Sequence, residues 1–138
     1  MLILGRAQIE EMYAHARAVE PQECCGLVGS KSENLASSVY RLRNVAAEPL
    51  TAYEAAPEEL FAAQRLMRER GEQLLGIYHS HPRSAEPVPS RKDVRLAYYP
   101  SAVYFIIGLS ATAATLRAFR LSERAGNWER AGFAIIDE

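Results

Sequence analysis

The stretch LLGIYHSH, from Leu74 to His81, most constrains what this chain can fold into. It reads as an apolar strand that gives way to a loop stiffened by three prolines. Side chains two residues apart on a strand point to the same face of the sheet. His79 and His81 are therefore expected to lie side by side at the end of a strand, with Ile77 behind them on the same face.

The rest of the sequence indicates one α+β domain built on a central mixed sheet. A length of 138 residues suits one domain with a sizeable core. Hydrophobic periodicity predicts helices over 6–19, 57–71 and 90–98, and strands over 24–30, 39–45, 74–80, 103–109, 116–121 and 128–136. Strands and helices in this mixed order favour helices packed on a sheet.

Composition and charge exclude several classes of protein. The net charge of −1 gives no electrostatic case for binding nucleic acid or an anionic membrane. No apolar run approaches membrane-spanning length, and the start MLILGR lacks the basic region of a signal peptide. Cys24 and Cys25, the only cysteines, are adjacent, which excludes a disulfide framework and a zinc ribbon and favours a reducing cytoplasm.

Two imidazoles on one face of a strand end can chelate a divalent metal, and neutral imidazole suits zinc. A His-x-His pair alone is weak evidence, because two histidines at the surface or at the edge of the core are a common alternative. The third histidine, His15, lies on the flank of a helix with no companion and is interpreted as structural or solvated.

Asp93 strengthens the metal interpretation. Only two aspartates occur, and the other, Asp137, is the penultimate residue. Pro82, Pro87 and Pro89 could fold the chain back so that Asp93 completes a His-His-Asp site. A fourth position open to water is the pattern of a catalytic zinc.

The pair Ser90 and Asp93 has a second interpretation that needs no metal. Ser-x-x-acid before an apolar run is the signature of a helix-capping box, with Ser90 as the N-cap. The two interpretations are compatible, because a capped helix is a rigid mount for a ligand.

A metal-assisted attack on an amide also needs a group that takes a proton from water and returns it to the leaving amine. Glu23, at the start of the strand CCGLVG, is the candidate. Composition alone gives Glu23 no preference over Glu54 or Glu86.

PQECCGLVG (21–29), GIYHSHP (76–82) and SRKD (90–93) together resemble the JAMM, or MPN-plus, metalloprotease family. The resemblance implies one zinc per chain held by His79, His81 and Asp93. It further implies Glu23 as general base and Ser90 as a hydrogen-bond donor to the oxyanion. One departure is a spacer of eight residues between His81 and Ser90, where family members usually have seven.

The same resemblance implies an MPN-type fold over residues 1–138, with a cytidine-deaminase-like architecture. The implied activity is hydrolysis of an amide bond after the C-terminal Gly-Gly of a ubiquitin-like or sulfur-carrier β-grasp protein. The alternative is a non-catalytic MPN scaffold, which would bind no tight zinc. A nucleoside deaminase is disfavoured, because His-x-Glu and Pro-Cys-x-x-Cys are both absent.

Two further questions stay open at this level. A homodimer could form edge to edge through strand 103–109 or through the C-terminal strand. Cys25 stands two residues after Glu23, as in the family pattern, and is interpreted as a small buried residue beside the site. A cysteine protease is disfavoured, because nothing in the pattern pairs a histidine with either thiol.

Overall fold

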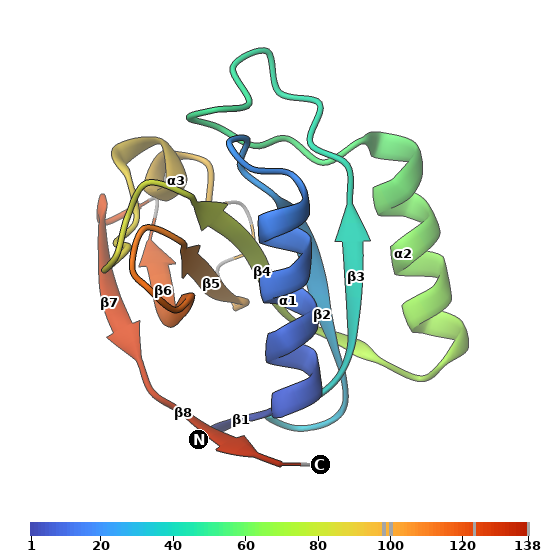
Figure 1. The fold of residues 1–138 in the computed structure, drawn as a ribbon. Coiled ribbons are helices and arrows are strands. Elements are labelled where there is room, and N and C mark those ends of the chain that lie inside the picture. Colours follow the sequence, from blue (N-terminus) through green and yellow to red (C-terminus); the bar gives the residue numbers. More distant parts are fainter. Residues whose placement is uncertain (98, 100, 123, 138) are drawn as a thin grey trace.

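The computed structural model describes residues 1–97, 99, 101–122 and 124–137 (Figure 1). The elements follow the order β1 (Leu2–Gly5), α1 (Arg6–Ala18), β2 (Cys25–Ser32), β3 (Leu35–Leu42), α2 (Pro57–Glu69), β4 (Gln73–His81), α3 (Arg91–Arg95), β5 (Val103–Gly108), β6 (Thr115–Ser122), β7 (Asn127–Ala131) and β8 (Phe133–Ile136). The strands form one sheet in the order β7-β6-β5-β4-β2-β3-β1-β8. Parallel and antiparallel pairs both occur in it. The expected α+β fold with a mixed central sheet is confirmed.

Helix α1 covers one face of the sheet, and Figure 1 shows it in front of the strands. Ile9, Met12 and Ala16, spaced at three and four residues, form its buried stripe. They pack in one apolar cluster with Tyr78 and Phe105 of the central strands. This face holds one of the two apolar core clusters and none of the candidate metal ligands.

Helices α2 and α3 pack on the other face. Ala63 and Met67 of α2 and Val94 of α3 share a second cluster with sheet residues that include Ile77. Because side chains alternate along a strand, His79 points to the same face as Ile77. The candidate site therefore lies on the α2 and α3 side of the sheet.

The two ends of the chain hold the largest differences from the sequence-based expectation. Strand β1 was not predicted, and it pairs in parallel with β8, with Leu2 opposite Phe133. The single strand expected over 128–136 is two strands, β7 and β8, with Gly132 between them. Strand β7 pairs with β6 and β8 with β1, so they lie at opposite ends of the strand order. One residue separates them, so the two edges of the sheet approach each other there (Figure 1).

Three smaller corrections concern the middle of the chain. Strand β3 runs over Leu35–Leu42 rather than 39–45, and Asn44 instead forms an isolated bridge with Ala55. Helix α3 is shorter than the expected 90–98, and Tyr98 lies outside the described residues. The prediction that strand 103–109 could form an edge-to-edge dimer is wrong, because this strand is β5, which lies inside the sheet between β4 and β6. Among the described residues no helix has both the length and the apolarity to cross a membrane.

Candidate metal centre

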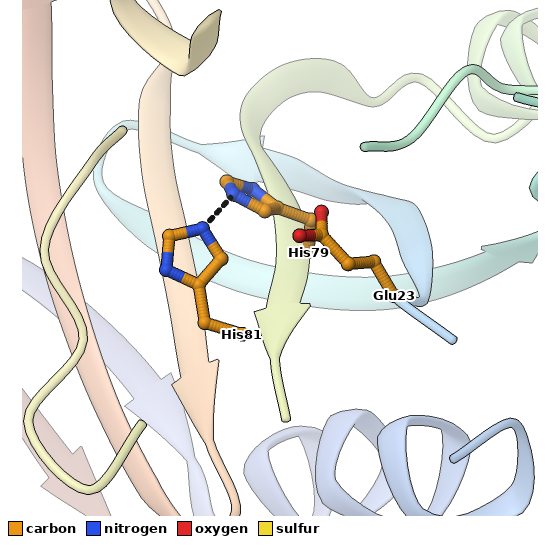
Figure 2. Close-up of side chains that lie close together, drawn as sticks. All are labelled: Glu23, His79 and His81. Carbon is orange, nitrogen blue, oxygen red and sulfur yellow. Dashed lines mark hydrogen bonds between the residues drawn. The ribbon is translucent and has the colours of Figure 1, made fainter. Parts of the chain in front are cut away.

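The two histidines converge at the end of β4, as the strand pattern predicts. The Nε2 atoms of His79 and His81 are 3.2 Å apart (Figure 2). The side chain of His79 is fully buried, whereas that of His81 is 18% exposed. The pair therefore has one anchored ring and one ring that borders solvent.

Asp93 reaches this pair from the start of α3. Its Oδ2 lies 3.2 Å from His79 Nε2 and 3.1 Å from His81 Nε2. The Ser90 N–H donates to the same Oδ2 at 2.8 Å, and the Asp93 N–H donates to Ser90 Oγ at 3.0 Å. The capping box is thus formed, and it orients the carboxylate toward the histidines. The eight-residue spacer does not keep Asp93 away from them.

The loop that delivers Asp93 is fixed to the sheet. Thr115 Oγ1 donates to Ala85 O at 2.9 Å, and the Ser110 N–H donates to Ser84 O at 3.2 Å. Gly108 permits this contact, because a Cβ there would lie 2.5 Å from Ser84 O. The loop is therefore held against the ends of β5 and β6.

The three converging atoms fit a tetrahedral metal ion. Metal–ligand bonds of about 2.0–2.1 Å to nitrogen and oxygen imply ligand–ligand separations of about 3.3–3.4 Å, close to the distances observed here. Two imidazoles and a carboxylate are a donor set that zinc accepts with a further position left for water. The group therefore supports a metal ion, and Asp93 is the carboxylate that closes the triangle.

The charges of the ligands are coupled. Burial alone lowers the pKa of His79, but the Asp93 carboxylate outweighs burial and raises it. Burial likewise raises the pKa of Asp93, but the two histidines and the Ser90 N–H hold it well below its usual range. The aspartate is therefore held ionised, which is the state that metal binding would require of it.

Glu23 lies beside the histidines, two residues before the start of β2 (Figure 2). One ligand atom each from Glu23, His79 and His81 can be chosen so that all three lie within 4.8 Å of one another. The residue is 6% exposed, and burial raises the pKa of its carboxyl to about 7. Its Oε1 is buried and has no hydrogen-bond partner among the described residues. Glu54 and Glu86, by contrast, are exposed.

The aromatic ring of Tyr53 packs against the candidate metal centre. Its ring stacks on the ring of His79, with centroids 4.5 Å apart and planes 26° from parallel. The same residue lines a largely apolar cavity of about 440 Å³ that borders Asp93. Leu60, Leu96 and Tyr99 also line this cavity. The centre thus opens beside a space that suits an apolar or flexible chain segment.

The other chemistry-bearing residues are structural. Cys24 and Cys25 are buried free thiols, and burial raises the pKa of each to about 12, so they are poor nucleophiles at neutral pH. His15 is buried on α1, where its Nδ1 lies 2.7 Å from the Tyr78 hydroxyl. Burial lowers the pKa of His15 to about 4, so it stays neutral.

Two residues at this site were missed by sequence reasoning, Tyr53 and Asn44. Both belong to the segment between β3 and α2; Asn44 falls at the end of the strand that was expected over 39–45, and Tyr53 lies in a stretch with no helix or strand period. Asn44 donates its side-chain amide to the carbonyl of Glu23 at 2.9 Å. An asparagine after a strand, ahead of a proline-containing loop, is a signal for a local side-chain cap, but it does not name the distant partner.

The fold brings the two histidines and the aspartate together as a candidate metal centre. The model of prokaryotic homologs of the JAB domain matches residues 6–122. The chain belongs to this family, and the JAMM resemblance inferred from the motifs is confirmed.

Curated relatives agree with this assignment. The chain is 38% identical over 102 residues to the desampylase of Haloferax volcanii, covering 70% of this chain and 73% of that protein. It is 37% identical over 123 residues to a probable TtuB-protein conjugate cleaving protease of Thermus thermophilus, covering 89% and 78%. It is 32% identical over 127 residues to the CysO-cysteine peptidase of Mycobacterium tuberculosis, covering 91% and 86%. The prediction of a JAMM-type hydrolase is confirmed at the level of this class.

Solved structures show the same fold. A solution structure of a Desulfitobacterium hafniense protein superposes with a TM-score of 0.87 at 33% identity, covering 100% of this chain and 94% of that one. A JAB1/MPN domain protein from Archaeoglobus fulgidus superposes with a TM-score of 0.66 at 17% identity, covering 99% and 100%. The second likeness concerns the fold alone.

Proposed function

We propose that this chain is a zinc-dependent isopeptidase or peptidase that hydrolyses an amide bond after the C-terminal Gly-Gly of a ubiquitin-like or sulfur-carrier β-grasp protein. The observation that carries this proposal is the triangle of His79 Nε2, His81 Nε2 and Asp93 Oδ2, with the buried Glu23 carboxyl beside it. A ligand set and a proton acceptor in one place are the parts that metal-assisted amide hydrolysis requires.

His79, His81 and Asp93 would hold one zinc ion per chain. Zinc supplies Lewis acidity there, which acidifies water and polarises a carbonyl group. Iron or cobalt could occupy the same donor set in vitro, and zinc is proposed because imidazole and carboxylate ligands suit it.

Glu23 is proposed as the general base and acid. A base works best when its pKa lies near the working pH, and burial brings the pKa of this carboxyl to about 7. Its buried Oε1 is free of protein partners in the described chain, so it can accept a proton from the attacking water. The same carboxyl then returns that proton to the leaving amine.

Ser90 is proposed to stabilise the oxyanion. Its Oγ accepts the Asp93 N–H, which leaves the Ser90 O–H available to donate toward a substrate oxygen. The residue is exposed and its backbone also holds Asp93, so the position of the hydroxyl is tied to that of the metal ligand. Helix capping and oxyanion binding are thus compatible roles.

The substrate class rests on the relatives and on the cavity beside Asp93. The three relatives are a desampylase, a probable TtuB-protein conjugate cleaving protease and a CysO-cysteine peptidase. A Gly-Gly tail is narrow and flexible enough to enter a cleft beside the metal, and the net charge of −1 favours a protein substrate over a polyanion. Residues 1–138 are taken as one domain that works in the cytoplasm, a location that the two free thiols support.

The test uses a β-grasp carrier protein ending in Gly-Gly, in two forms. In one form the final glycine carries a single cysteine through an amide bond; in the other it is joined to a lysine side chain of an acceptor peptide. We expect the zinc-loaded protein to cleave at least one form after the final glycine, as read by mass spectrometry, and His79→Ala to cleave neither. No cleavage of either form, or equal cleavage by His79→Ala, would overturn the proposal.

A further inference from the structure

Asn44 ties two parts of the site together. It lies just after β3, and its side-chain Nδ2 donates to Glu23 O and to Ala52 O, both at 2.9 Å. Its Oδ1 accepts the Ala46 N–H at 2.9 Å and the Glu54 N–H at 3.0 Å. All four hydrogen-bonding positions of the Asn44 amide are therefore used, and three of the four partners belong to the loop between β3 and α2.

The orientation of this amide follows from its partners. Both Nδ2 partners are carbonyl oxygens, which only accept, and both Oδ1 partners are N–H groups, which only donate. A rotation that exchanged nitrogen and oxygen would place like groups against each other at all four contacts. Asparagine is thus the residue whose side chain satisfies this set.

The partners of Asn44 carry two functional side chains. One partner is the peptide of Glu23, whose N–H is held from the same loop by Pro49 O at 2.8 Å. The other partners include Ala52 and Glu54, which flank Tyr53 on both sides. Tyr53 in turn stacks on His79. One amide therefore restrains both the proposed base and the ring packed on a proposed metal ligand.

We propose that Asn44 is a positioning residue. Its side-chain amide holds the Glu23 backbone in place and, through the residues on either side of Tyr53, holds the Tyr53 ring against His79. Asn44 contacts neither the histidines nor the Glu23 carboxyl through a described bond, so it acts through those residues. The kinetic part of this inference rests on the proposed function, but the geometric part does not.

Other hydrogen bonds also hold the loop, so we expect it to stay closed when the Asn44 amide is removed. The Val45 N–H donates to Glu54 O at 2.8 Å, and the Ala56 N–H donates to Arg43 O at 2.9 Å. These backbone bonds do not involve the Asn44 side chain. We therefore expect Asn44→Ala to fold while the Glu23 peptide and the Tyr53 ring lose their common restraint.

The experiment compares Asn44→Ala and Asn44→Asp with the wild type, using the two β-grasp probes and ¹⁵N-histidine NMR. Loss of a group that orients metal ligands typically costs about 10–100-fold, so kcat should fall by about that factor with KM within about threefold. Aspartate keeps the acceptor for Ala46 and Glu54 but loses both donors, so it should be at least as impaired as alanine. The imidazole resonances of His79 should move, and those of His15, buried on α1, should stay.

Glu72→Gln is the matched control for general destabilisation. Glu72 is buried and bonded by hydroxyls of β3, and none of its partners belongs to the site. At temperatures equally far below each unfolding midpoint, we expect this control to keep the wild-type kcat and His79 resonances. A kcat loss in the control equal to that of Asn44→Ala would overturn the inference.

Two further outcomes would also overturn it: wild-type kcat in Asn44→Ala, or His79 resonances unchanged by the substitution. The spectra separate this inference from the proposed function. If the wild type cleaves neither probe, the proposed function fails, whereas the histidine resonances of the metal-free and zinc-loaded proteins still decide whether Asn44 positions His79.

Discussion

Two glutamates that are buried to almost the same extent differ in whether their carboxyl oxygens find hydrogen-bond partners. Glu23 is 6% exposed and Glu72 is 7% exposed. Glu72, at the turn into β4, accepts hydrogen bonds from the hydroxyls of Ser37, Ser38 and Tyr40. Glu23 has an oxygen with no partner among the described residues.

The pKa of each carboxyl records this difference. Burial tends to raise both, but at Glu72 the hydroxyls and Arg70 outweigh burial and lower the pKa. At Glu23 burial prevails and the pKa rises to about 7. A satisfied carboxylate anchors strands, whereas an unsatisfied one beside metal ligands is a group whose proton can move. Burial alone therefore does not identify a functional acid. The presence or absence of hydrogen-bond partners on the carboxyl group distinguishes a functional acid from a structural one.

The largest expected effect is on catalysis by Glu23→Gln. Removal of the proton acceptor should lower kcat by about 10²–10⁴-fold, the usual contribution of general acid–base catalysis. The matched change Glu72→Gln should leave kcat within about twofold, because that carboxylate touches no site residue. Steady-state cleavage of the Gly-Gly probes measures both. Comparable losses in the two variants would erase the distinction.

The next largest effect is on the free energy of unfolding, where Glu72→Gln should be the more damaging of the two substitutions. Glu72→Gln weakens hydrogen bonds between hydroxyls and a charged acceptor, so the free energy of unfolding should fall by about 1–3 kcal/mol. Glu23→Gln replaces a buried carboxyl whose Oε1 has no hydrogen-bond partner among the described residues, so it should be neutral or stabilising at pH 8 in metal-free protein. Urea denaturation measures both changes. A Glu23→Gln protein less stable than Glu72→Gln would show that Glu23 is the better satisfied acid.

The pH dependence of stability sharpens the contrast in metal-free protein. The folded-state pKa of Glu23 is raised from 4.5 to about 7, so its contribution is present below pH 4.5 and is lost as the pH rises through 7. That loss amounts to up to about 3 kcal/mol, since one pKa unit corresponds to about 1.4 kcal/mol. The difference in unfolding free energy between the wild type and Glu23→Gln should therefore shift against the wild type from pH 4.5 to 8.

Glu72 has the opposite sign. Its folded-state pKa is lowered from 4.5, so its contribution is present above pH 4.5 and is lost as the pH falls through the folded-state pKa. The difference between the wild type and Glu72→Gln should thus shrink below pH 4.5. Denaturation series in chelator at several pH values measure both trends, and parallel curves for the two variants would contradict them.

The smallest effect is expected from Tyr40→Phe. This change removes one of the hydroxyls on Glu72 and should lower the free energy of unfolding by about 1 kcal/mol, with no change in kcat. Thermal unfolding beside Glu72→Gln checks it. A loss larger than that of Glu72→Gln would mean that Tyr40 acts through its packing or its contact with Arg70 rather than through the carboxylate.

The sequence allowed prediction of those parts of the molecule that local periodicity determines. Helices α1 and α2 and strand β4 follow from apolar spacing, and the shared face of His79 and His81 follows from the period of a strand. The capping box formed by Ser90 and Asp93 is likewise a local pattern that the sequence predicts. These features depend on residues close together in the chain.

The parts that were missed depend on distant partners. Strand β1 is defined by pairing with β8 at the other end of the chain, which no local pattern shows. Asn44 is an ordinary loop residue until its amide meets Glu23, twenty-one positions upstream. The roles of Glu23 and Glu72 are equally invisible in composition, because only the fold decides which acid meets hydroxyls and which meets histidines.

The most direct test of the central claim is a zinc titration of metal-stripped protein, followed by cleavage of the Gly-Gly probes. If His79, His81 and Asp93 hold one catalytic zinc, cleavage should be absent without metal and should rise to a plateau at one equivalent per chain. Cleavage that is equally fast in the metal-stripped protein, or no cleavage at any zinc concentration, would contradict the account.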